Sequence, residues 1–193
     1  YRDPAQNASS LRDGYLDSGD LAYTDEAGRL YIAGRSKDLI IRSGHNIDPL
    51  LIENALQAHP AVALAAAVGQ PDRYAGELPV CYVALRPDMQ ASVEELMQFA
   101  QPLIAERPAW PKQIFVVDPM PMTSVGKIFK PQLRNDAVRR VVVGEIARMC
   151  DPDRVEVDVA AGGKRGTQVT SRLPAEVADL RGGKIGERFT DGE

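Results

Sequence analysis

Short apolar runs separated by turn residues predict several β-strands in the first two-thirds of the chain. Two of these runs lie within 14–34, on either side of the sequence DEAG at 25–28. An Asp-rich turn that ends in Gly between such runs predicts a β-hairpin. Further strands are predicted at 39–41, 62–68, 80–85 and 114–117.

The first predicted helix begins at Asp48, whose side chain can accept a hydrogen bond from the first helical turn. Pro49 follows at the first helical position, where its missing N–H costs little. Apolar residues at helical spacing then share one face of the helix: Ile52, Ala55 and Leu56. Pro60 ends this helix.

The clearest helical pattern follows a capping box, SVEE at 92–95, in which the serine and the glutamate can each satisfy a free N–H at the helix start. The apolar stripe of this helix comprises Leu96, Phe99, Ala100, Leu103 and Ile104. Another helix is predicted over 131–143. Strands and helices that alternate around one core predict a compact α+β or α/β domain over roughly 38–140.

Beyond about residue 145 the pattern changes and predicts an added hairpin. Positions 155–159 alternate strictly between apolar and acidic residues, and 168–173 can pair with them across the glycine-rich turn 160–166. From Arg181 the chain is polar and glycine-rich, and we expect it to be mobile. A packing appendage or a dimer contact is the expected role of this extension, rather than a second active site.

The composition is that of an ordinary globular protein, with 44% hydrophobic and 26% charged residues and a formal net charge of -4 over 193 residues. This charge disfavours a general nucleic-acid binder. Cys81 and Cys150 lie in unrelated contexts, so neither a disulfide framework nor a zinc site is indicated, and Cys81 is expected in the core. No apolar run is long enough to span a bilayer and no signal peptide opens the chain, so a cytoplasmic location is expected.

The first residues, 1–13, form an irregular polar segment that does not begin with Met. We therefore expect the chain to be a fragment of a longer protein. A fragment can carry catalytic residues without being a complete enzyme.

Three sequence motifs occur in order along the chain. The first is GYLDSGD at 14–20, and the second is GRSKD at 34–38, followed by SGHNI at 43–47 and the pattern P-x-x-I-E at 49–53. The third is PMTSVGKI at 121–128. The order and spacing resemble those of the adenylate-forming superfamily of acyl-CoA synthetases, luciferases and adenylation domains, with serine at position 18 in place of the usual threonine. HPAV at 59–62 and G-E-x-P at 76–79 also fit this resemblance, which covers 14–134.

The resemblance implies an α+β fold and a division of the chain. Residues 1–34 would be the last segment of a large N-terminal domain, contributing a β-hairpin, and 35–38 would be a hinge. Residues 38–140 would form a small AMP-binding lid, with a short mixed sheet flanked by helices. Residues 141–193 would be a C-terminal extension, and the acyl pocket and phosphate-binding loop would lie in the missing N-terminal portion.

Lys127 is the candidate catalytic residue. Adenylation brings an acyl carboxylate to the α-phosphate of ATP, and a compact ammonium can bridge their negative oxygens. Gly126 allows the backbone to approach closely. A P-loop is excluded, because position 121 is proline and Ile128 replaces the hydroxyl that would hold magnesium.

Four further residues gain candidate roles from the resemblance. Asp20 corresponds to an aspartate that accepts the ribose hydroxyls of ATP, and Arg35 to an arginine that reaches the ribose and phosphate. Lys37 falls at the hinge, about which the lid rotates between two half-reactions. Gly44 would let the pantetheine arm of CoA pass against bare backbone.

The function that the resemblance implies is that of an acid–thiol ligase. A carboxylic acid and ATP, with Mg²⁺, would give acyl-AMP, and CoA would then give the thioester. An adenylation domain that loads a carrier protein and a non-catalytic interaction module are the alternatives. The isolated chain is expected to be inactive without its N-terminal domain, a homodimer is an open alternative for its assembly, and the identity of the acid is not readable.

Overall fold

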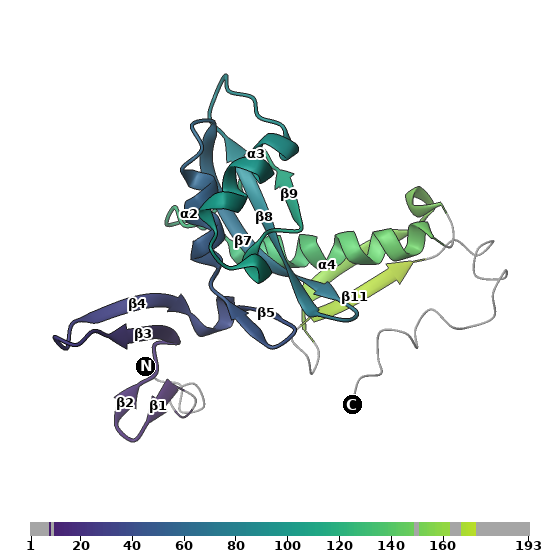
Figure 1. Cartoon of the computed structure of the whole chain (residues 1–193). Helices are drawn as coiled ribbons and strands as arrows, with labels where there is room; N and C mark the ends of the chain where they lie inside the picture. Colours follow the sequence, from purple (N-terminus) through teal and green to yellow (C-terminus); the bar gives the residue numbers. More distant parts are fainter. Residues whose placement is uncertain (1–7, 9, 149–150, 163–166, 173–193) are drawn as a thin grey trace. The chain divides into compact units, whose positions relative to one another are not determined.

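The computed structural model describes residues 8, 10–148, 151–162 and 167–172 (Figure 1). The chain divides into two compact units, Tyr1–Ile128 and Phe129–Glu193. Each unit mixes helices and strands, which confirms the predicted α+β class. Within the described residues, no helix has both the length and the apolar character needed to cross a bilayer. Cys150 lies outside the described residues, and so does the segment that begins at Arg181, which was predicted to be mobile.

Two small antiparallel hairpins open the first unit. Strand β1 (Leu11–Arg12) pairs with β2 (Tyr15–Leu16), and β3 (Asp20–Thr24) pairs with β4 (Leu30–Arg35). The second of these confirms the hairpin predicted around 25–28.

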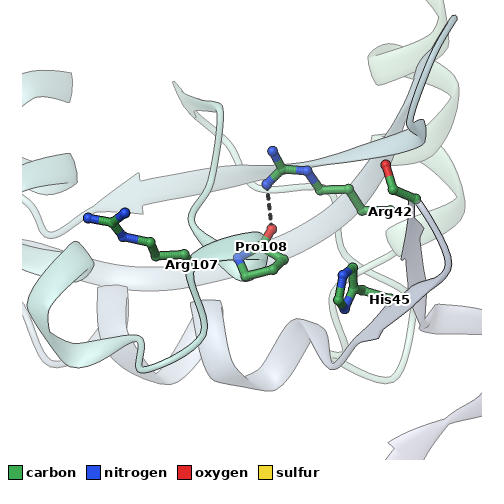
Figure 2. A pocket seen from close by; sticks show the side chains of 5 residues that line it. Arg42, His45, Arg107 and Pro108 are labelled. Atoms are coloured by element: carbon green, nitrogen blue, oxygen red, sulfur yellow. Dashed lines mark hydrogen bonds between the residues drawn. The ribbon is translucent and has the colours of Figure 1, made fainter.

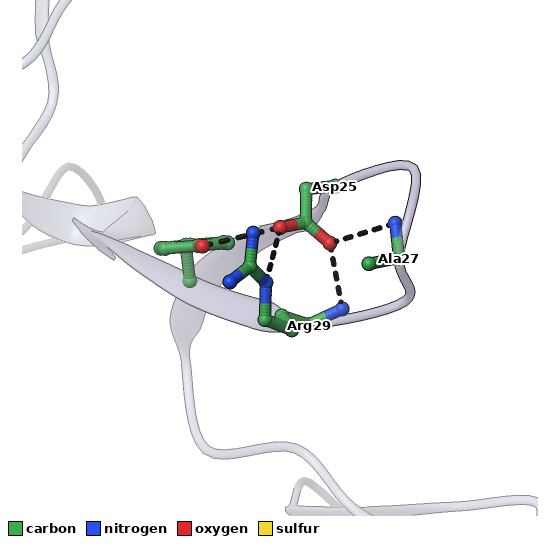
Figure 3. A network of polar contacts seen from close by, with 4 residues as sticks. Asp25, Ala27 and Arg29 are labelled. Atoms are coloured by element: carbon green, nitrogen blue, oxygen red, sulfur yellow. Dashed lines mark hydrogen bonds and ion pairs between the residues drawn. The ribbon is translucent and has the colours of Figure 1, made fainter.

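Asp25 closes the turn between β3 and β4 (Figure 3). One carboxylate oxygen accepts hydrogen bonds from the backbone N–H groups of Ala27, at 3.0 Å, and Arg29, at 2.9 Å. The other accepts from the Arg29 Nε at 2.6 Å and from the Tyr31 hydroxyl at 3.1 Å. These donors, the Arg29 backbone N–H first among them, hold the pKa of Asp25 below its ordinary value.

A five-stranded mixed sheet forms the centre of the first unit. Its strands are β5 (Ile40–Arg42), β6 (His45–Ile47), β7 (Val62–Asp72), β8 (Gly76–Leu85) and β9 (Gln113–Val116). The order is β6-β5-β8-β7, and β9 pairs parallel with β8 over Val80 to Val83. Because β7 pairs with β8 along its length, β5 and β9 share the opposite edge of β8.

Two capped helices pack on this sheet. Helix α2 (Pro49–Gln57) begins as predicted, with the Asp48 side chain accepting from the Leu50 N–H at 2.9 Å. It packs against β7, and α3 (Val93–Ala100) packs against α2 and β9. The shared core is fully or almost fully buried and includes Ile40, Ile47, Ile52, Leu56, Val62, Cys81, Val83, Leu96, Ala100 and Ile114. Cys81 is therefore a core residue, as predicted.

The capping box at the start of α3 is only half formed. Ser92 Oγ accepts from the Glu95 N–H at 3.1 Å, as predicted. The Glu95 carboxylate does not accept a hydrogen bond from the Ser92 N–H, as a full capping box requires. It lies instead 3.4 Å from the Nε2 atom of His59. His59 is buried, and its Nδ1 accepts from the Ala61 N–H at 3.2 Å, so this histidine has a structural role.

The predicted apolar stripe is correct for Leu96 and Ala100 but wrong for Leu103. Helix α3 ends at Ala100, and a short 3₁₀ segment follows at Gln101–Leu103. Pro102 lacks the N–H that would continue the α-helical bonding, so Leu103 turns outward and is 56% exposed. Ile104 is again buried.

The second unit contains α4 (Lys130–Ala147), β10 (Glu156–Ala161) and β11 (Thr167–Arg172), with a short 3₁₀ turn at Pro152–Arg154. The antiparallel pairing of β10 with β11 confirms the predicted C-terminal hairpin. Residues 163–166, in its turn, lie outside the described residues. Its own small core joins α4 to β10 through Val142, Ile146, Val155 and Val157. Helix α4 is longer than predicted and runs across the predicted domain boundary at 140.

We expect Leu96→Ala to lower the free energy of unfolding by about 2–5 kcal/mol, because it removes a fully buried side chain and leaves a cavity. The matched control is Leu103→Ala, which should change the free energy of unfolding by less than about 0.5 kcal/mol, because Leu103 is exposed. Urea unfolding of both variants measures the difference. Equal losses would mean that the core ends elsewhere.

Candidate functional site

Lys127 lies on a turn that its own backbone stabilises. Met122 and Ile128 form an antiparallel bridge at the base of this turn. Inside it, the Thr123 N–H donates to the Lys127 carbonyl at 2.7 Å, and the Lys127 N–H donates to Thr123 Oγ1 at 3.1 Å. Gly126 adopts φ +76°, a left-handed conformation that favours glycine. Thus the spacing T-x-x-G-K places the lysine on a fixed backbone.

The Lys127 side chain is exposed, in contrast to its well-bonded backbone. Within the described residues its ammonium forms no ion pair. A positive charge is therefore presented to solvent from a defined position. The sequence indicated Lys127 itself but did not reveal the role of the Thr123 hydroxyl, which the motif spacing could have suggested.

The structure brings Asp20 and Arg35 together at one end of the β3–β4 hairpin. The two residues are register partners, and Arg35 Nε lies 3.2 Å from Asp20 Oδ1. The Gly19 carbonyl accepts from both the N–H and the hydroxyl of Ser36, at 3.0 Å and 3.1 Å. The SGD turn is therefore tied directly to the segment that follows Arg35. The Arg35 side chain is 66% exposed, so this ion pair is open to solvent.

Lys37 lies, along the chain, between the β3–β4 hairpin and the five-stranded sheet. It is an exposed residue of the 3₁₀ turn Ser36–Asp38, which follows β4 and precedes β5. The turn contains no buried residue. Few packing contacts would thus be lost if its backbone angles changed.

Gly44 occupies a two-residue turn between β5 and β6. Ser43 has φ +49°, Gly44 has φ +82°, and Arg42 pairs with His45, as in a type I′ hairpin turn. No described atom lies within 4 Å of a Cβ built on Gly44. The backbone at Gly44 is therefore accessible.

A hollow of about 330 Å³ lies beside this turn (Figure 2), lined by Arg42, Ser43, His45, Arg107 and Pro108. Arg42 Nη1 donates to the Pro108 carbonyl at 2.7 Å, which connects the turn to the loop before β9. A second hollow, of about 390 Å³, shares Arg42 and Arg107 and adds Lys112. Three cationic side chains from two distant segments of the sequence thus border these neighbouring hollows, which suits an anionic ligand.

Asp72 stabilises the turn between β7 and β8, against which the Gly44 turn rests. Its Oδ1 accepts from the N–H groups of Tyr74, at 2.9 Å, and Ala75, at 2.7 Å. The Ala75 carbonyl in turn accepts from the Ser43 N–H at 2.7 Å. The Ala75 N–H, then that of Tyr74, and the charge of Arg42 hold the pKa of Asp72 below its ordinary value.

The candidate residues do not form one contiguous cluster. Asp20 and Arg35 are in contact, whereas Lys127 and Gly44 lie on separate turns. In the part of the chain that the structure describes, no hydrogen bond or ion pair joins Lys127 to Asp20, Arg35 or Gly44. Sequence reasoning missed Arg42 and Arg107, because these residues are 65 positions apart and belong to no common motif.

Comparison with known proteins identifies the domain. Residues 51–127 match the family model of the AMP-binding enzyme C-terminal domain. The fold is similar to ATP-bound MatB from Rhodopseudomonas palustris, with a TM-score of 0.64 and 31% identity over 70% of this chain and 27% of that one. The chain belongs to the adenylate-forming superfamily, and the region that matches is the C-terminal domain of those enzymes.

The chain is also similar to CoA ligases over most of its own length, which confirms the resemblance. It is 48% identical over 146 residues to a marinolic acid–CoA ligase of Pseudoalteromonas sp. (strain SANK 73390), covering 76% of this chain and 22% of that protein. It is 41% identical over 133 residues to a long-chain-fatty-acid–CoA ligase of Bacillus subtilis (strain 168), covering 69% and 24%. The chain thus spans less than a quarter of the length of these two relatives.

Asp72→Asn should make the stability of the protein less dependent on pH. A carboxylate whose pKa is lowered by folding stabilises the folded state above its ordinary pKa of 3.8. That contribution is lost as the pH falls through the lowered value in the folded state. We therefore expect the difference in unfolding free energy between wild type and Asp72→Asn to be largest at neutral pH and to shrink in acid, as measured by urea unfolding across this range.

The control is Asp88→Asn, at an exposed aspartate, which should change the unfolding free energy at neutral pH by less than about 0.5 kcal/mol. A difference between wild type and Asp72→Asn that stays constant with pH would contradict the role assigned to Asp72.

Proposed function

We propose that this chain forms the lid and adjoining hinge of an ATP-dependent acyl-CoA synthetase. In the first half-reaction a carboxylate oxygen attacks the α-phosphorus of ATP, giving acyl-AMP and releasing pyrophosphate. In the second, the CoA thiol attacks the acyl carbonyl, giving the thioester and releasing AMP. The observation that carries this proposal is the exposed Lys127 on a rigid turn within a chain that matches the C-terminal domain of these enzymes.

Lys127 is proposed to act in the first half-reaction. Its ammonium would lie between the attacking carboxylate and the phosphate oxygens and would offset the charge that develops there. At 4 Å and an effective dielectric constant near 20, one such attraction is worth about 4 kcal/mol, or roughly a hundredfold to a thousandfold in rate. The hydrogen bonds of the 123–127 turn support this role. They fix the backbone of Lys127, so that only its side chain has to move to reach the substrates.

Asp20 and Arg35 are proposed to bind the nucleotide. A carboxylate can accept hydrogen bonds from two neighbouring ribose hydroxyls, and a guanidinium can donate to ribose and phosphate oxygens. An exposed ion pair is worth at most about 1 kcal/mol, so a nucleotide can replace part of it at little cost. Their contact would therefore keep both groups together for the nucleotide.

Lys37 is proposed as the hinge, and Gly44 as the point where the pantetheine arm passes. A few exposed backbone angles can absorb a large rotation of a domain, and the Ser36–Asp38 turn contains no buried residue. The accessible backbone at Gly44 leaves room for a narrow chain. The predicted domain boundaries are part of this proposal: the hinge would be 35–38, and the rotating lid would be 38–140.

ATP, CoA and a carboxylic acid are the proposed substrates, and Mg²⁺ is proposed to accompany ATP on its phosphates. The chain spans less than a quarter of the length of its two CoA-ligase relatives, so we propose that an N-terminal portion supplies the acyl pocket. The chain alone should then turn over little or no acid.

Lys127→Ala in the protein joined to its N-terminal portion should lower the rate of acyl-AMP formation by at least about a hundredfold. It should spare thioester formation from supplied acyl-AMP, because the charge is needed only when the carboxylate meets the phosphate. Pyrophosphate release measures the first step, and chromatography of acyl-CoA measures the second. The matched control is Arg139→Ala, which removes a positive charge from an exposed position of α4. Equal loss in both steps would exclude the role of Lys127.

Lys37→Pro should have the opposite effect, sparing acyl-AMP formation and reducing thioester formation. Proline fixes φ and removes the N–H, so the hinge could no longer change its backbone angles. Lys37→Ala is the control, because it removes the side chain and leaves the backbone mobile, and it should keep both steps. Intact thioester formation in Lys37→Pro, measured by the same chromatography, would show that the hinge lies elsewhere.

A further inference from the structure

The hairpin that carries Gly44 has few backbone bonds to the rest of the sheet. Strand β6 is at the edge of the sheet, and β5 lies between it and β8. In the described part of the chain, β5 and β8 pair at a single position, Arg42 with Gly76. A ladder this short fixes the position of a hairpin poorly, so other contacts must determine where the Ser43-Gly44 turn lies.

The side chain of Glu77 supplies one of these contacts. Its Oε2 accepts from the Ile41 N–H at 2.9 Å, across 36 positions of sequence. Ile41 precedes Arg42, the residue of β5 that pairs with β8. The carboxylate thus takes the place of a backbone carbonyl and continues the attachment of β5 to β8 by one residue.

Gly69 provides the space in which this carboxylate lies. A Cβ built on Gly69 would be 2.5 Å from both Cδ and Oε2 of Glu77, which is closer than atoms can approach. In the register of β7 and β8, Gly69 pairs with Pro79 and Pro71 pairs with Glu77, so Gly69 is the diagonal neighbour of Glu77. A side chain at position 69 would therefore force the Glu77 carboxylate to shift.

Two further bonds hold the same hairpin. The Ser43 N–H donates to the Ala75 carbonyl at 2.7 Å, and Arg42 donates to the Pro108 carbonyl at 2.7 Å (Figure 2). Glu77, Ala75 and Pro108 therefore hold three consecutive residues, 41–43, immediately before Gly44. Of these three acceptors, only that of Glu77 is a side chain. The bond between Arg42 and Pro108 has a side-chain donor, whereas that between Ser43 and Ala75 joins two backbone groups.

We propose that Glu77, lying over Gly69, is a positioning residue that fixes the Ser43-Gly44 turn for the thioester half-reaction. This inference rests on the proposed function, in which CoA passes Gly44. Glu77 acts through the Ile41 N–H and touches no substrate. Its loss should therefore weaken the use of CoA and leave acyl-AMP formation, which uses Lys127, intact.

The test measures both half-reactions separately in the protein joined to its N-terminal portion. Glu77→Ala removes the acceptor, and Gly69→Ala keeps the carboxylate but displaces it. Both should raise the KM for CoA by about 10- to 100-fold, as expected when a reacting surface is misplaced by about 1 Å. Acyl-AMP formation should stay within about twofold of wild type, since Lys127 lies on a separate turn.

Glu77→Gln distinguishes the hydrogen bond from the charge. Its amide oxygen can still accept from the Ile41 N–H, so the KM for CoA should stay close to that of wild type. The matched control for glutamate substitution is Glu94→Ala, at an exposed position on α3, which should leave both steps unchanged. Amide hydrogen exchange of 40–47 should become faster in Glu77→Ala and in Gly69→Ala, because the Ile41 N–H loses its acceptor.

The outcomes separate this inference from the proposed function. Normal acyl-AMP formation with an unchanged KM for CoA in both alanine variants would overturn the inference alone. Parallel loss of both half-reactions in both variants would also overturn it, because the effect would then be general. A wild-type protein that forms no acyl-AMP from any acid tested would overturn the proposed function and this inference with it.

Discussion

The long pairing of β7 with β8 is the interaction on which the first unit depends. It runs from Val62 opposite Leu85 to Asp72 opposite Gly76, and its central residues are fully buried. Helices α2 and α3 pack against the sheet that it organises, and β9 and β5 share the free edge of β8. The turn that joins β7 to β8 also bonds to Ser43. One pair of strands thus sets both the core and the position of the Gly44 turn.

The candidate site combines a firmly bonded backbone with exposed charged side chains. Thr123 holds the backbone of the Lys127 turn, and Ser36 holds the turn before Asp20, while the charged groups of Lys127 and Arg35 face solvent. A solvated charge retains its hydration until a ligand arrives, and a weak ion pair can be exchanged for contacts with that ligand. This arrangement suits the proposed lid, which would present the same groups repeatedly as it opened and closed.

Local signals in the sequence were reliable where the physics is local. The Asp25 turn, the Asp48 cap and the Ser92 cap each depend on residues two to four positions apart, and all three occur as predicted. One error arose where a distant residue competed, and the other arose from an adjacent proline. Glu95 lies beside His59 rather than capping its own helix, and Leu103 is exposed because Pro102 ends the helical bonding.

Sequence patterns alone were enough to predict most helices and strands and the hairpins formed by β3 with β4 and by β10 with β11. They also supplied the family motifs that nominate Lys127, Asp20, Arg35, Lys37 and Gly44. Which of these residues are in contact, and which other groups support them, depends on the folded arrangement. The pairing of Asp20 with Arg35 follows from a strand register with an irregularity after Leu21. The contact of Glu77 with Ile41, and the hollow that both Arg42 and Arg107 line, bring together residues far apart in sequence. Such contacts depend on the register and edge order of the sheet, which short-range patterns do not specify.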